Sequence, residues 1–189
     1  MVRSLSVLAW AGFVLTACVE AVPTARTSTV SVLQGSFTVA AASGYCIDTQ
    51  AGRERNDSGA YLIGRCVQQS QVAPALITLS VGQPGSAGVM NAGGAELAAF
   101  FTSEEGRATL SSNGRASALR VLDARSAGDV FVMRLQDRNA PSYWRAVFAL
   151  RGRLVSVSVK GGGDAALPEI EGRSVLDSAV AALQRANRV

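Results

Sequence analysis

Alternating apolar and polar residues between positions 119 and 160 limit most strongly how this chain can fold. Phe131, Met133 and Leu135 occupy every second position of one segment, and three valines do so between residues 154 and 160. Such alternation is typical of strands, because successive side chains point to opposite faces of a sheet. It predicts four strands at residues 119–124, 130–136, 143–150 and 154–160. The links between them are short, so we expect an antiparallel meander with one face against helices.

The helical period appears in the middle of the chain. Leu97, Phe100 and Phe101 stand at i, i+3 and i+4, and this spacing predicts an amphipathic helix over residues 95–105. Gly106 is the expected end or break of that helix, and a further turn over residues 107–112 stays open. Two further strands are expected before it, at residues 35–41 and 75–81.

A second helix is expected at the C-terminus. Leu176, Val180 and Leu183 form one apolar stripe, which predicts a helix over residues 174–187. An earlier start near residue 168 stays open, with Gly172 as its weak point. Together these elements predict a single α+β domain over residues 35–189, in which a mainly antiparallel sheet packs against two helices.

The N-terminal residues predict export from the cytoplasm. Arg3 precedes an apolar run of residues 5–15 that is shorter than the roughly 20 residues needed to span a bilayer, a combination typical of a signal peptide. A buried N-terminal helix is the alternative. Leu15-Thr16-Ala17-Cys18 resembles the lipobox of bacterial lipoproteins and places the end of the signal peptide at residue 17.

The lipobox resemblance implies a lipid anchor. In that family a peptidase cleaves before the cysteine, the thiol of Cys18 receives a diacylglycerol, and the new amine is acylated by a fatty acid such as palmitate. Two or three acyl chains anchor firmly, because each buried methylene contributes about 0.8 kcal/mol. Val19 stands where Asp signals inner-membrane retention, so the resemblance indicates the outer membrane, facing the periplasm. Residues 18–34, which include Pro23, predict a flexible tether, although a first strand could begin at residues 30–33.

Two cysteines remain if Cys18 is lipidated. Residues 45–48 and 60–67 have the composition of strands and flank a polar segment at 49–59, which predicts a hairpin with a long loop. In a hairpin centred on Asn56, Cys46 and Cys66 face each other with Cα atoms about 4.5 to 5.5 Å apart. An oxidising compartment favours their pairing, so we expect a Cys46–Cys66 disulfide. Two free buried thiols are the alternative.

The order of the expected elements resembles the α/β/α sandwich of the PsbP/Mog1-like group. The resemblance covers most of residues 35–188 and consists of the succession of strands and helices, without a shared motif. It implies a fold and no activity, because one fold hosts many functions.

The composition excludes several classes of enzyme. The chain contains no histidine, so it cannot form a Ser-His-Asp or Cys-His catalytic set by itself. A Ser-Lys enzyme would need Lys160, the only lysine, and Val157 stands where the Ser-x-x-Lys motif requires serine. The other basic residues are arginines scattered along the chain, so the net charge of +4 does not indicate a nucleic-acid partner. We expect no cofactor.

Two groups of residues are left as candidate sites. Asp48, Glu54 and Asp57 could hold a hard cation or serve a carboxylate-based hydrolase, but Arg53 and Arg55 offset their charge. A solvated loop without a metal is therefore favoured. The second group is aromatic and could line a binding surface or pack in the core: Tyr45, Tyr61, Tyr143 and Trp144.

The sequence therefore predicts a protein anchored in the bacterial envelope through the lipid on Cys18. We expect it to be a binding or structural module of the periplasm or outer membrane, and not an enzyme. An accessory subunit of an envelope complex, with a protein partner, is the alternative.

Overall fold

The meander expected between residues 119 and 160 forms half of a larger antiparallel sheet. The computed structural model describes residues 26–67, 71–163 and 166–188. The predicted signal peptide, Cys18 and residues 19–25 of the predicted tether lie outside them. All four predicted strands are confirmed, and each extends beyond its predicted range: β7 Leu119–Ala127, β8 Val130–Asp137, β9 Ser142–Leu150 and β10 Arg153–Gly161.

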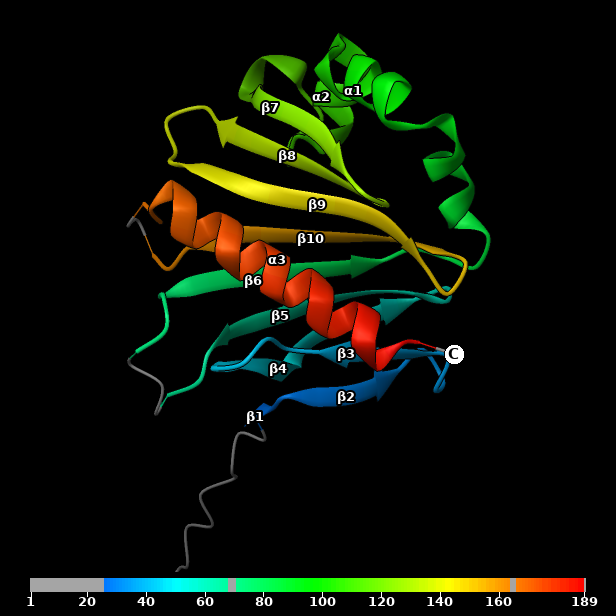
Figure 1. Cartoon of the computed structure of the whole chain (residues 1–189), viewed down its shortest axis with the longest axis vertical. Coiled ribbons are helices and arrows are strands. Elements are labelled where there is room, and N and C mark those ends of the chain that lie inside the picture. The colour runs from blue at the N-terminus through cyan, green and yellow to red at the C-terminus, as the bar shows by residue number, and fades with distance from the viewer. Residues whose placement is uncertain (1–25, 68–70, 164–165, 189) are drawn as a thin grey trace, which may run out of the picture.

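The other half of the sheet comes from the N-terminal part of the chain. Strand β6 has the predicted bounds and pairs with β10, joining the two halves. The strand order is β1-β4-β5-β6-β10-β9-β8-β7, with antiparallel pairing between all neighbours (Figure 1). The additional strands are β1 Arg26–Thr27, β4 Tyr45–Arg55, β5 Ser58–Arg65 and β6 Ala75–Val81.

The folded domain begins earlier than the sequence predicts. Part of the expected tether forms β1 and β2, Thr29–Val32, which pairs with β3, Phe37–Ala40, in a separate two-stranded sheet. Leu33 and Gln34 turn the chain between them with φ of 51° and 57°. Leu33 is only 3% exposed, so burial of this turn explains why residues 26–34 belong to the domain.

Helix α3, Glu169–Ala186, begins near residue 168, as the alternative for the C-terminal helix predicted. Gly172 is buried within it and allows close packing: a Cβ there would lie 3.0 Å from Cδ1 of Trp144. Gly172 is therefore a packing contact and not the expected weak point. The helix crosses one face of the sheet over β9 and β10 and lies beside β3 (Figure 1).

The predicted middle helix is divided in two, α1 Gly94–Thr102 and α2 Glu104–Leu110. The break occurs at Ser103, whose Oγ accepts a hydrogen bond from the amide of Gly106 at 3.1 Å and so caps α2. Gly106, the expected end, lies inside α2, where a Cβ would collide with the carbonyl of Phe100. Two short 3-10 helices flank this pair, Ser86–Ala92 and Ala116–Ala118.

Helices cover both faces of the sheet, and each face has its own apolar core. Phe131, Met133 and Leu135 of β8 pack with α1 and α2, whereas Val132 belongs to the core under α3. Strands β8 and β9 are thus covered on both faces, and the fold is a single mixed α+β domain dominated by its sheet. Within the described residues, no helix is both long and apolar enough to cross a membrane.

The Cys46–Cys66 disulfide is confirmed, with Cα atoms 5.1 Å apart. The predicted long loop is wrong, because Asn56 and Asp57 form a two-residue turn with φ of 50° and 57°. The pairing register shifts between Asp48 and Arg53, so that Cys46 lies opposite Gly64. The two cysteines are therefore displaced from direct opposition and remain close enough to bond.

Candidate binding groove

The four aromatic residues considered for a binding surface belong to the core. Tyr45, Tyr61, Tyr143 and Trp144 are 4%, 5%, 4% and 5% exposed. Trp144 Nε1 donates a hydrogen bond to the carbonyl of Glu169 at 3.0 Å, and Tyr61 Oη donates to a carboxylate oxygen of Glu54 at 3.0 Å. Their polar atoms thus have partners inside the protein, which confirms the alternative that these residues pack in the core; of the four, Tyr45 also borders the groove described below.

Burial of the three tyrosines predicts an alkaline transition. Burial raises the pKa of Tyr45 and Tyr61, and it raises the pKa of Tyr143 to about 12. Unfolded tyrosines ionise near pH 10, so the unfolded chain loses protons that the folded chain keeps, and the free energy of unfolding falls as pH rises above 10. Tyrosinate absorbance should appear only together with loss of circular dichroism. Tyrosinate in a fully folded sample near pH 10 would contradict this.

The acidic residues of the β4–β5 hairpin do not converge on one site. Asp48 Oδ1 accepts hydrogen bonds from the amides of Gln50 and Ala51 at 3.0 and 3.1 Å. Glu54 is engaged by Tyr61, and Asp57 lies in the turn. Within the described residues, no group of three or more His, Cys, Asp or Glu side chains is placed to hold a metal ion. The positions of these carboxylates therefore offer no support for a hydrolase.

Lys160 is held in a charged contact. Its Nζ lies 2.8 Å from Oδ2 of Asp137 and 4.0 Å from the ring centroid of Tyr143. Ser158, two residues away on β10, accepts a hydrogen bond from Nε of Arg145 at 2.8 Å. The Lys160 ammonium is thus engaged by Asp137, and no described serine hydroxyl is bonded to it.

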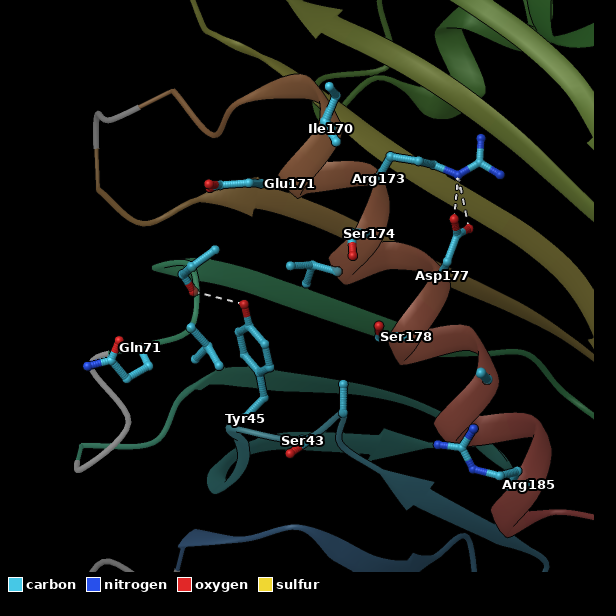
Figure 2. A pocket seen from close by; sticks show the side chains of 15 residues that line it. Ser43, Tyr45, Gln71, Ile170, Glu171, Arg173, Ser174, Asp177, Ser178 and Arg185 are labelled. Atoms are coloured by element: carbon cyan, nitrogen blue, oxygen red, sulfur yellow. Dashed lines mark hydrogen bonds and ion pairs between the residues drawn. The ribbon is translucent and has the colours of Figure 1, made fainter.

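A groove of about 1070 Å³ lies between α3 and the segments around residues 42–45 and 71–73. One wall contains Val72 and the edge of Tyr45, whose Oη donates a hydrogen bond to the carbonyl of Ala73 at 2.8 Å. The opposite wall is α3 (Figure 2). Gly44 allows the two segments of the first wall to pack closely, since a Cβ at this position would lie 2.6 Å from Cγ1 of Val72.

The α3 wall is fixed in shape and carries charge at both ends. Nε of Arg173 donates to both carboxylate oxygens of Asp177 at 2.9 and 3.0 Å, one helical turn away. Figure 2 shows Glu171 near one end of the wall and Arg185 near the other. Neither of these two residues forms an ion pair with any described side chain.

The helix also presents two serines between those charges and an apolar side chain just before Glu171. Ser174 and Ser178 are exposed and one turn apart, and Ile170 is 85% exposed at the start of the helix. Such a surface can bind apolar side chains and donate hydroxyl hydrogen bonds. The sequence analysis missed the groove because its walls come from segments far apart in the chain. The only local signal was the polar stripe of serines on the outer face of α3.

Comparison of the chain with protein-family models, with curated proteins and with solved structures finds no match. The groove is therefore interpreted from its geometry alone.

Proposed function

We propose that this protein is a lipid-anchored binding module of the bacterial envelope, in the outer membrane facing the periplasm. The lipobox resemblance of residues 15–18 supports the anchor, and the Cys46–Cys66 disulfide fits an oxidising compartment. The groove beside α3 is the structural feature that supports a binding role. The resemblance to the PsbP/Mog1-like group remains a prediction about the fold and adds no function.

The groove suits a polypeptide segment better than a small molecule. Small-molecule sites have volumes of roughly 300 to 1,000 Å³ and enclose most of the ligand. This groove measures about 1070 Å³ and is open along α3. Glu171 and Arg185 are 14 positions apart on the helix, about 21 Å along its axis at 1.5 Å per residue. An extended segment of about six residues spans that distance.

The charges specify how such a segment would lie. Glu171 favours a basic side chain at one end of the bound segment, and Arg185 favours an acidic side chain at the other. Apolar side chains of the segment would contact Val72 and, beside Glu171, Ile170, while Ser174 and Ser178 would bond the backbone of the segment. The bound partner is therefore a protein with an exposed apolar segment flanked by opposite charges.

Replacement of Cys18 by serine tests the anchor. A serine cannot form the thioether to diacylglycerol, so Cys18→Ser should remain unprocessed by the lipoprotein peptidase and lack the mass of the lipid. Mass spectrometry of membrane extracts from cells making either form checks this result. Identical mass and processing of the two proteins would contradict a lipoprotein.

Replacement of Ser178 by tryptophan tests the groove. The indole fills the space beside α3, so Ser178→Trp should abolish partner recovery after mild detergent extraction without lowering the thermal midpoint. Gln184→Trp is the matched control, because Gln184 lies on the same helix but does not line the groove. Equal recovery with both variants would exclude the groove as the binding site.

An accessory subunit of an envelope complex is the second candidate function. It uses the same groove, and stable stoichiometric co-purification with the complex separates it from transient binding of a free partner. A carboxylate-based hydrolase stays the least supported of the three functions, since Asp48 and Glu54 are engaged in separate hydrogen bonds.

A further inference from the structure

A second hollow, of about 440 Å³, lies on the other face of the sheet near the β4–β5 turn. Tyr61, Leu79 and Val155 point into the core under α3, so the residues beside them on β5, β6 and β10 point to the opposite face. Those residues line the hollow, together with the start of the 3-10 helix Ser86–Ala92. The hollow is therefore separate from the groove beside α3.

Hydroxyl groups line this hollow. Ser80 of β6 lies directly opposite Ser156 of β10, and within the described residues neither hydroxyl makes a hydrogen bond. Ser58 and Ser86 add two hydroxyls, which donate to the carbonyls of residues 55 and 83 at 2.7 and 2.6 Å. Ser80 and Ser156 are thus free to donate to a ligand held between them.

Two arginines border the hollow without a carboxylate partner. Nη1 of Arg53 donates to the carbonyls of Gln50 and Gly52 at 2.9 and 2.8 Å, which holds the guanidinium beside β4. The guanidinium of Arg55 makes no hydrogen bond or ion pair with the described residues. No acidic side chain lines the hollow, and Glu54 is directed to the other face, where it accepts from Tyr61.

A buried arginine on the α3 side of β10 supports one wall of the hollow. Arg153 is 5% exposed, and its guanidinium donates to the carbonyls of Asp57 and Gly82 and to Oγ of Ser36. All three acceptors are neutral, and no described carboxylate forms an ion pair with Arg153. Since Gly82 lines the hollow, the hydrogen bond from Arg153 to its carbonyl helps to position this wall.

We infer that this hollow binds a phosphate group, with Arg53 and Arg55 supplying charge and Ser80 and Ser156 supplying hydroxyl donors. Guanidinium groups match phosphate in charge and in bidentate geometry. The phosphate belongs either to a phospholipid headgroup or to a soluble phosphorylated molecule. The site depends on neither the lipid anchor nor the groove.

Titration of the purified protein with inorganic phosphate, followed by nuclear magnetic resonance, tests the site. Saturable shifts are expected at Ser80 and Ser156. Binding should weaken about tenfold or more in the double variant Arg53→Gln/Arg55→Gln, because hydrogen bonds to charged groups are strong, and about fivefold in Ser156→Ala. The matched control is Arg120→Gln/Arg125→Gln, which removes equal charge from β7 at the far edge of the sheet.

Vesicles distinguish the two sources of phosphate. Preferential cosedimentation with phosphatidylglycerol over phosphatidylcholine, lost in Arg53→Gln/Arg55→Gln and kept in the control, identifies a lipid headgroup. Specific binding of inorganic phosphate without that preference identifies a soluble ligand. Equal weakening by the two double variants, or absence of both binding and preference, overturns the proposal.

Discussion

Replacement of Cys46 and Cys66 by serine should lower the free energy of unfolding by about 3 kcal/mol. The disulfide closes a loop with a sequence separation of 20 residues, and a loop of that size restricts the unfolded chain by about this amount in the chain-entropy model. Because the bond joins the first strand of the β4–β5 hairpin to the chain just after the second, it also limits opening of that edge of the sheet. Urea unfolding followed by circular dichroism measures the change.

A reductant provides the control for the disulfide. It should shift the unfolding midpoint of the wild-type protein to that of Cys46→Ser/Cys66→Ser and leave the variant itself unaffected. A wild-type midpoint that stays the same with and without reductant, under conditions that reduce the bond, would contradict a stabilising disulfide.

Replacement of Trp144 by alanine should lower the free energy of unfolding by about 3 to 5 kcal/mol, as expected for loss of a buried aromatic side chain. Trp144 is 5% exposed, packs against Gly172 and donates a hydrogen bond to the carbonyl of Glu169. These contacts attach the first turn of α3 to β9. The guanidinium of Arg173 lies 5.4 Å from its ring centroid. The variant should therefore lose stability throughout the domain.

Trp144→Phe is the matched control for this prediction. It keeps an aromatic ring under α3 and removes the indole donor, so its loss should be smaller than that of the alanine variant, which also leaves a cavity. Thermal unfolding followed by circular dichroism compares the three proteins. If Trp144→Ala were as stable as the wild type, the ring would not be part of the core.

The sequence predicted the elements that have a clear period. The four strands of the meander, β6 and the apolar stripe of α3 were all visible, because burial of one face imposes a period of two on strands and 3.6 on helices. The predictions about glycines were less accurate. Gly106 and Gly172 suggested helix breaks, yet both sit inside helices where a neighbouring group leaves no space for a Cβ.

In the β4–β5 hairpin the cysteine pairing was predicted correctly, although the register of the two strands was not. The polar residues around Asn56 indicated a long loop, whereas the strands continue through them and turn at Asn56 and Asp57. The polar residues of this segment do not mark a loop, because β4 lies near the edge of the sheet, where the side chains of a strand remain in water. The cysteines still meet, since a small shift in register keeps their Cα atoms within bonding range.

The sequence by itself determined the α+β class, most strand positions and the cysteine pairing, because these depend on local periodicity and on a small number of candidate partners. Only the tertiary structure decided which aromatic residues are buried, and it brought α3 against residues 42–45 and 71–73 to form the groove. It also placed Arg53 and Arg55 beside serines of distant strands. Those arrangements depend on contacts between segments far apart in the chain, and such contacts leave no periodic trace within either segment.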